Sequence, residues 1–224
     1  MGDRDRDPLG EDTALSYAAI RRVIGLAGLA LPFVLGLAAI VDGHLKISMS
    51  AYYYSDLRDY FTGTLCVIGV FLFCYRFRAP HAEGWLAKLG GLAALGVAFF
   101  HTAPAGAVTT AVRVRSDVHF TCATILFVIL GDISFQFFPS AESVAERRAH
   151  EHRFYRACGL VIWVGIAGYA LVSNLFPGTC RRHPVLFWVE TVCVLAFSLS
   201  FLVKGEFAES VRTLIRRSPD LPGA

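Results

Sequence analysis

The sequence predicts an all-α integral membrane protein, a bundle of six transmembrane helices, and three observations support this. Only 17% of the residues are charged, whereas a soluble domain carries about 25%, and the mean hydropathy is +0.52. The charges gather in clusters between apolar runs of about 20 residues, the length that an α-helix needs to cross the hydrocarbon core. A β-barrel would show alternating segments of about ten residues, and the sequence has none.

The predicted spans are joined by short polar segments. They cover residues 18–41, 60–78, 85–104, 118–138, 154–176 and 185–203. Small residues recur within them, at Gly25 and Gly28, Gly90 and Gly91, and Gly159 and Gly165. Because glycine lets helix backbones approach closely in lipid, these positions predict helix–helix contacts.

The distribution of Lys and Arg predicts the orientation. With the N-terminus inside the cell, the inner segments hold 15 of these residues and the outer loops hold 6. Cytoplasmic loops carry the excess of positive charge, so we expect a multi-pass protein of the cell membrane with both termini cytoplasmic. The predicted parts are a polar cytoplasmic tail over 1–17, the membrane domain over 18–204, and an amphipathic cytoplasmic segment over 205–224.

The stretch Ser48–Gly63, between the first two spans, has an unusual composition. It holds four tyrosines, three serines, two aspartates and one arginine. We interpret it as a polar, aromatic lid that re-enters the membrane domain where the second span begins. The alternative for its tyrosines is an aromatic belt at the membrane surface.

Glu190 is the polar residue that most needs an explanation. It lies about five residues into the sixth span, roughly 8 Å below the outer end. A charged side chain inside a span costs roughly 2.5–3.5 kcal/mol on insertion scales. No residue within one turn neutralises it, so it is either protonated or paired across the bundle.

Other polar residues lie near the same level or deeper. Asp59 and His119 stand at the mouths of their spans, and His101 is near the outer end of the third. Helix capping is the alternative for Asp56 and Asp59, and hydrogen-bonded packing is the alternative for the two histidines. Asp132, in the inner third of the fourth span, is expected to pair with an arginine of the inner loop or to act in function.

These residues predict one acid-bearing cavity in the outer half of the bundle. Asp59 and Glu190 would face it, and aromatic side chains, Phe99 among them, would line it. A carboxyl group kept from water favours its neutral form and can donate a proton. The catalytic candidates are Asp59, Glu190, His119, His101 and Tyr54. The substrate-binding candidates are Tyr53, Tyr60, Phe61, Phe100 and Phe120.

The expected partners follow from this cavity. They are a lipophilic small-molecule substrate and membrane lipid, with no nucleic acid, no cofactor and no metal ligands in the leading interpretation. The oligomeric state stays open.

Several motifs together carry a family resemblance. They are the run Ser-x-Ser-Ala-Tyr-Tyr-Tyr from Ser48, Arg58-Asp59, Gly63, the run from Gly69 to Leu72, Tyr75, Val118-His119-Phe120, the basic-aromatic run Arg153–Gly159, and Lys204-Gly205-Glu206. The chain resembles, over most of its length after residue 20, a family of small bacterial multi-pass membrane proteins. This resemblance implies the membrane fold and no particular activity.

A second resemblance, of layout and not of a strict motif, is to the integral-membrane terpene cyclases of meroterpenoid and indole-sesquiterpenoid pathways. Those chains use one carboxyl near the second helix and another near the last, and Asp59 and Glu190 match these positions. The resemblance implies protonation of an epoxide or alkene of a prenylated indole or other aromatic substrate. The carboxylate motifs Asp-Asp-x-x-Asp and Asp-x-Asp-Asp of soluble cyclases do not occur.

A third resemblance, to zinc-dependent lipid hydrolases of the alkaline-ceramidase type, rests on Ser50, Asp59, His101 and His119. The late His-x-x-x-His of that family and its seventh helix are missing. A further alternative is a non-enzymatic lipid-binding or scaffold protein that uses the tyrosine-rich stretch as its contact surface.

Overall fold

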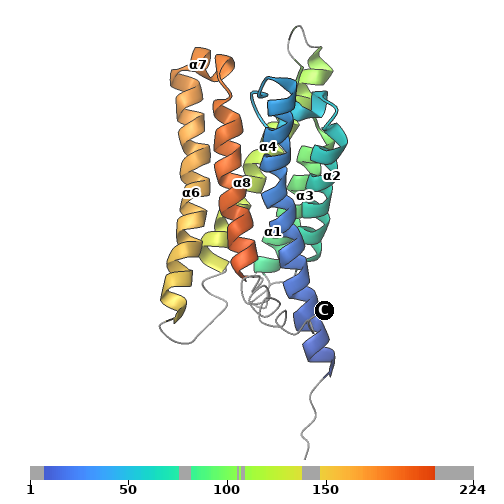
Figure 1. The fold of residues 1–224 in the computed structure, drawn as a ribbon, viewed down its shortest axis with the longest axis vertical. Coiled ribbons are helices and arrows are strands. Elements are labelled where there is room, and N and C mark those ends of the chain that lie inside the picture. Colours follow the sequence, from blue (N-terminus) through green and yellow to red (C-terminus); the bar gives the residue numbers. More distant parts are fainter. Residues whose placement is uncertain (1–7, 76–81, 105, 107–108, 138–146, 205–224) are drawn as a thin grey trace, which may run out of the picture.

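The computed structural model describes residues 8–75, 82–104, 106, 109–137 and 147–204, and these ranges contain helices and no strand (Figure 1). The long helices are α1 (Pro8–Asp42), α2 (Arg58–Cys74), α3 (Ala82–Phe99), α4 (Thr110–Asp132), α6 (Arg147–Leu175) and α8 (Val185–Lys204). Three short elements complete the fold: the 3₁₀ helix η1 (Ser50–Tyr54), the π-helical turn η2 (Ile133–Phe137) and α7 (Pro177–Arg182).

The predicted all-α class is confirmed, and so are apolar helices of membrane-spanning length. Four helical segments are long and apolar enough to cross a membrane: Ala19–Asp42, Thr110–Gln136, His152–Leu175 and Val185–Lys204. Gly84–Phe99 is a shorter apolar helix. Each of the six predicted spans overlaps one long helix, whereas six crossings and the side of the termini stay predictions.

Three helices begin at least seven residues earlier than the hydropathy pattern indicates, and one of them is α6, which starts at Arg147 although the predicted span begins at residue 154. α1 starts at Pro8, within the predicted polar tail, and α4 starts at Thr110, eight residues before the predicted span. The first turns of α4 carry Arg113, Arg115 and Asp117, which lower the hydropathy although the backbone is helical. Thr109 caps this helix, since its side chain accepts a hydrogen bond from the Val112 amide. The predicted amphipathic helix after residue 205 lies outside the described residues.

The helices pack side by side, with η1 and α7 at the same end of the bundle (Figure 1). α1 packs against α2 and α8, α3 lies between α2 and α4, and α6 packs against α8 and α4. The start of α1 and the end of α8 lie toward the opposite end.

Glycines mark the close approaches between helices, as predicted. A Cβ atom on Gly91 would lie 2.6 Å from the Gly69 carbonyl oxygen, and one on Gly159 would lie 2.7 Å from the Gly131 carbonyl oxygen. The other four predicted glycines also face neighbouring helices at contact distance: Gly25, Gly28, Gly90 and Gly165. The predicted role of these small residues in helix packing is therefore confirmed.

Asp132 lies at the end of α4, where η2 begins. Its carboxylate accepts a hydrogen bond of 2.8 Å from the Gln136 side-chain amide. The side chains of Arg147 and Arg148 in the inner loop lie outside the described residues, so the predicted ion pair of Asp132 with an inner-loop arginine stays a prediction.

Candidate functional site

Glu190 anchors the tyrosine-rich stretch to the first turns of α8. Its Oε2 accepts a hydrogen bond of 2.6 Å from the Met49 backbone amide, which directly precedes η1. The Phe187 amide donates to the Ile47 carbonyl oxygen at 3.1 Å. These two bonds hold residues 47–49 against α8, although 141 residues separate Met49 from Glu190 in the chain.

The anchored segment is buried in the end of the bundle. Ser48, Met49, Ser50 and Tyr52 are all buried, and Tyr52 is only 1% exposed. The Ser48 hydroxyl accepts a hydrogen bond from the Ala51 amide and contacts the Ser50 hydroxyl, each at 3.1 Å. The start of the predicted lid therefore packs among the ends of the helices, as its interpretation as a lid predicts.

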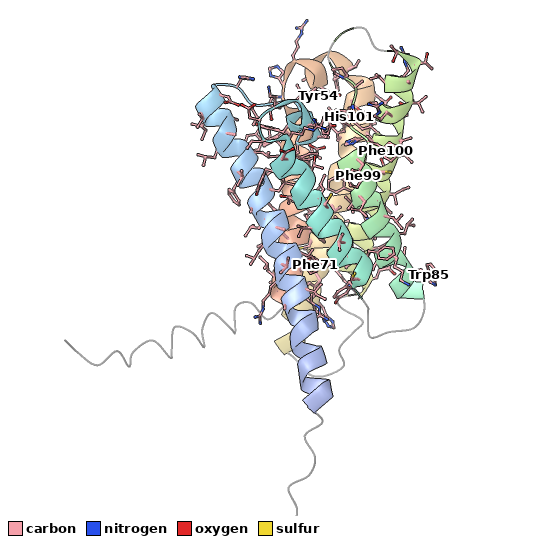
Figure 2. All side chains as sticks on the ribbon, turned by 90° about the vertical axis from the view of Figure 1, so that its right-hand side faces the viewer. Tyr54, Phe71, Trp85, Phe99, Phe100 and His101 are labelled. Carbon is pink, nitrogen blue, oxygen red and sulfur yellow. The ribbon has the colours of Figure 1, made fainter. Side chains whose placement is uncertain are left out.

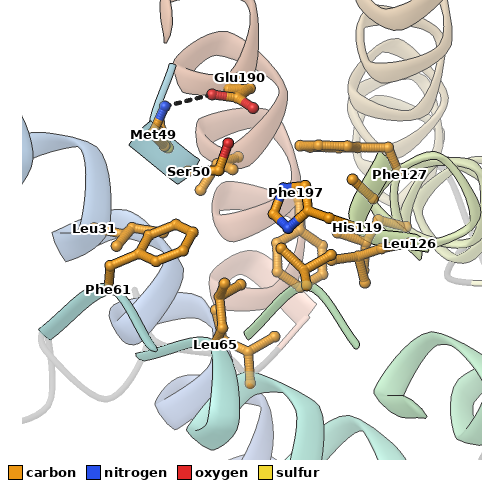
Figure 3. Close-up of a pocket in the computed structure, with 15 residues that line it drawn as sticks. Leu31, Met49, Ser50, Phe61, Leu65, His119, Leu126, Phe127, Glu190 and Phe197 are labelled. Carbon is orange, nitrogen blue, oxygen red and sulfur yellow. Dashed lines mark hydrogen bonds between the residues drawn. The ribbon is translucent and has the colours of Figure 1, made fainter. Parts of the chain in front are cut away.

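A cavity of about 60 Å³ lies beneath this segment (Figure 3). Glu190 and Ser50 lie at its upper edge in this view, with Phe61 on the left and His119 on the right. Most of its lining is apolar: Leu31, Met49, Ser50, Phe61, Leu65, Ile68, Val97, His119, Ala123, Leu126, Phe127, Leu130, Glu190, Val194 and Phe197.

His119 is the second ionisable side chain of the cavity. It is 2% exposed, and its Nδ1 lies 2.6 Å from the Phe100 carbonyl oxygen. A carbonyl oxygen only accepts hydrogen bonds, so Nδ1 carries the proton and donates it. In the neutral ring, Nε2 is then the nitrogen that can accept a proton.

The chain matches no family model, no curated protein and no solved structure. The geometry of the site therefore carries the functional interpretation.

A separate group of side chains, the rim cluster, lies at the η1 end of the bundle. Its members are Tyr53, Tyr54, Arg58, His101 and Arg115. Tyr53 stacks on His101 with ring centroids 4.4 Å apart, and Arg58 lies 4.4 Å from the Tyr53 centroid. Arg58 donates to the Tyr53 hydroxyl at 2.7 Å, and Tyr54 donates to the Thr102 carbonyl oxygen at 2.5 Å.

Burial and the charges of the rim cluster both favour the neutral form of His101. The Arg115 guanidinium donates to His101 Nε2 at 2.8 Å, so this nitrogen is an acceptor. Burial lowers the pKa of His101, and the positive charges of Arg115 and Arg58 lower it further. Burial and the neighbouring Tyr53 raise the pKa of Tyr54, which keeps its hydroxyl proton at neutral pH.

Three of the predicted site residues line the cavity, namely Glu190, His119 and Phe61. Asp59 does not, so the predicted pair of carboxyls in one cavity is not present. Asp59 is exposed in the first turn of α2. It precedes Phe61 by two residues, which is about 200° around a helix, so it faces away from the cavity. Its position suits the alternative interpretation, stabilisation of the helix N-terminus.

The remaining candidates lie outside the cavity lining. His101, Tyr53 and Tyr54 belong to the rim cluster, and Tyr60 is half-buried against the core. Phe100 and Phe120 are exposed, together with Phe99, and do not line the cavity. Phe100 still contributes through its backbone, since its carbonyl oxygen holds His119.

Sequence reasoning missed most of the lining. Val194 and Phe197 follow Glu190 by four and seven residues, and Ala123 and Leu126 follow His119 at the same spacing. This spacing places them on one helix face with the two polar residues, so the periodicity was a usable signal. Met49 carried no such signal because its role comes from a backbone amide.

The described residues do not form a centre for zinc. No group of three His, Cys, Asp or Glu residues converges among them, whereas a catalytic zinc needs three protein ligands. Of the residues offered for zinc, His101 has its Nε2 occupied by a guanidinium, and Asp59 is exposed away from the cavity.

Proposed function

We propose that this chain binds a lipophilic small molecule at the cavity beneath residues 48–54, and that Glu190 is the acid that acts on it. The observation that carries the proposal is a carboxyl group in a largely apolar and aromatic lining. The reaction we propose is acid-initiated cyclisation of a prenylated aromatic substrate, such as an indole. Such a site suits this chemistry because a carboxyl that holds its proton can protonate an epoxide or alkene.

The proposed reaction is an isomerisation, so the substrate and the product have the same atomic composition. Glu190 gives its proton to the epoxide oxygen, and the adjacent C–O bond breaks to leave a carbocation and a hydroxyl group. The π bond of an alkene in the substrate then attacks this carbocation, which forms the C–C bond of the ring and leaves the positive charge on the other alkene carbon. The aromatic faces of Phe61, Phe127 and Phe197 stabilise the cation. A neighbouring C–H bond then loses its proton to Nε2 of His119, and the proton returns to Glu190 before the next turnover.

The cavity volume limits how the substrate binds. Small-molecule sites typically measure about 300–1,000 Å³, whereas this cavity has about 60 Å³. The proposal therefore requires lining side chains to move when the substrate enters. It also implies that only the reactive end of the substrate reaches Glu190.

We further propose that six helices cross the cell membrane, with both termini in the cytoplasm. The distribution of Lys and Arg supports this orientation. Aromatic side chains at the two ends of α3 also support a crossing, with Trp85 at one end and Phe99, Phe100 and His101 at the other (Figure 2). At 1.5 Å per residue this 18-residue helix is about 27 Å long. In this orientation the cavity lies in the outer half, so a substrate made in the cell has to cross the membrane first.

Turnover by matched variants tests the proposal. The purified protein in lipid nanodiscs is incubated with a prenylated indole that carries a terminal epoxide, and cyclic products are measured. We expect Glu190→Gln to lower turnover by about 10²–10⁴-fold, the usual contribution of a general acid. Asp59→Asn is the control, because it removes an exposed carboxyl outside the cavity. Equal turnover by Glu190→Gln and the unmodified chain would refute the acid assignment.

A second candidate function is binding of a lipophilic ligand without chemistry. One observation favours it: a Glu190 oxygen is engaged by the Met49 amide, which is a structural role. In this case the nanodisc experiment shows bound prenylated indole and no product, and Glu190→Gln leaves the amount bound unchanged.

A further inference from the structure

The rim cluster holds two positive charges that have no carboxylate partner among the described residues. Asp56, Asp59 and Asp117 are exposed and near in sequence, yet within the described ranges none of them forms an ion pair with Arg58 or Arg115. Each of these arginines makes one side-chain hydrogen bond, to Tyr53 and His101 respectively.

The two guanidinium groups are fixed in place and still have donors to offer. A guanidinium carries five N–H donors, so each arginine retains most of its own. The stacked rings of Tyr53 and His101 lie between them, with Arg58 over one ring and Arg115 bonded to the other. His101 adds no charge of its own, because its Nε2 accepts from Arg115. The planar guanidinium fork matches the geometry of phosphate oxygens.

An exposed apolar surface continues from the rim cluster along α3. Phe99 is 65% exposed and Phe100 is 44% exposed. Figure 2 shows both below His101 and Tyr54 on the same side of the molecule. Cationic donors therefore lie above an apolar aromatic surface. A phospholipid has the matching profile, with an anionic phosphate above its acyl chains.

We propose that the rim cluster binds the phosphate of an anionic phospholipid, whose acyl chains lie against Phe99 and Phe100. This site is separate from the cavity and uses none of its lining residues. Its ligand is a lipid and not a free anion because the apolar surface continues directly from the charged one.

Lipid retention tests the proposal. The full chain in detergent is mixed with equal amounts of phosphatidylglycerol and phosphatidylcholine that carry identical acyl chains, and retained lipids are counted by native mass spectrometry. We expect a preference for phosphatidylglycerol, which Arg115→Gln lowers about fivefold and Arg58→Gln/Arg115→Gln abolishes. Glutamine at position 115 can still donate to His101, so folding is not expected to change.

Two controls distinguish a specific lipid site from a nonspecific effect of positive charge and from binding of free phosphate. Arg113→Gln removes the same charge from the same helix, two residues away and outside the cluster, and we expect it to keep the preference. An equal loss in Arg113→Gln, or equal retention of both lipids by the unmodified chain, would overturn the proposal. Loss of phosphatidylglycerol on addition of millimolar inorganic phosphate would also overturn it, in favour of a free-anion site.

Discussion

At the scale of single residues, Glu190 has two roles, as the acid that we propose for the cavity and as the anchor of the segment before η1. Its carboxyl lines an apolar cavity, and one of its oxygens also receives the Met49 amide. A neutral carboxyl and a carboxylate can both accept this hydrogen bond. The anchor therefore does not prevent the acid chemistry that we propose, and variants can separate the two roles.

Glutamine and alanine at position 190 should differ in stability. Gln retains an oxygen that accepts from Met49, whereas Ala leaves this partly buried amide without a partner, which costs about 1–3 kcal/mol. We expect Glu190→Ala to lower the free energy of unfolding in detergent by this amount, and Glu190→Gln to lower it by much less. Identical melting curves for the two variants would contradict the anchoring role.

His101 should make the protein less stable in acid. Its pKa in the folded protein is lowered from its ordinary value of 6.5, first by burial and then by the arginine charges. As the pH falls below about 6.5, the unfolded chain takes up a proton that the folded chain resists, so the free energy of unfolding decreases. The decrease ends once the pH has passed below the lowered pKa.

Unfolding measured between pH 7.5 and pH 5 checks this expectation. His101→Gln should lose stability less steeply on acidification than the unmodified chain, because Gln does not titrate. His44→Gln is the control, because His44 is an exposed histidine in the connection between α1 and η1 and lies outside the rim cluster. If His101→Gln loses stability more steeply on acidification than the unmodified chain, His101 does not make the folded protein less stable in acid, and the expectation is contradicted.

At the scale of helices and segments, close backbone contacts hold neighbouring helices together. A Cβ atom at Gly91 would lie 2.6 Å from the Gly69 carbonyl oxygen and 2.7 Å from the Phe73 amide nitrogen. Both are backbone atoms, so α2 and α3 must move apart to admit it. We expect Gly91→Ala to destabilise the protein by about 1–3 kcal/mol.

Gly63→Ala is the matched control for this expectation. It lies on α2 as well, and a Cβ atom there would meet nothing within 4 Å. Because alanine favours the helix over glycine by about 1 kcal/mol, Gly63→Ala should be neutral or stabilising in thermal unfolding. A Gly91→Ala variant as stable as Gly63→Ala would contradict the tight packing of α2 against α3.

The helices were more predictable from the sequence than the site. Apolar run length located all six long helices, because each of them overlaps one of the long apolar runs of the sequence. It failed at the start of α4, where charged residues continue the helix beyond its apolar part. Glu190 was identifiable because no neighbouring residue neutralises it. The predicted position of Asp59 in the cavity was wrong, because a place in the first turn of a helix does not determine which way the side chain faces. The contact between Met49 and Glu190 was not predictable, because it depends on tertiary structure alone.

At the scale of the whole molecule, the proposed six crossings can be checked by cysteine labelling. In a background without the six native cysteines, His44→Cys and His183→Cys should react with a membrane-impermeant maleimide on intact cells. His152→Cys, at the start of α6, should react only after permeabilisation. Labelling of His152→Cys on intact cells would contradict a cytoplasmic position for this end of the bundle.

The cavity lies between five helices and the segment that joins α1 to α2. Helices α1, α2, α3, α4 and α8 each contribute lining residues, and the segment before and within η1 closes the space between them. The carboxyl of α8 thus lies within the bundle, in contact with a connection that is distant in sequence. A protein of this design can keep an acidic side chain away from bulk water while holding it in a fixed orientation.

The central claim is that Glu190 holds a proton in this cavity at neutral pH. Infrared difference spectroscopy of the protein in nanodiscs, titrated across neutral pH, measures this directly through the C=O stretch of a protonated carboxylic acid. We predict such a band at pH 7 that is lost in Glu190→Gln and retained in Asp59→Asn. A spectrum in which Glu190→Gln leaves the band unchanged, or in which no such band is present at pH 7, would contradict the claim.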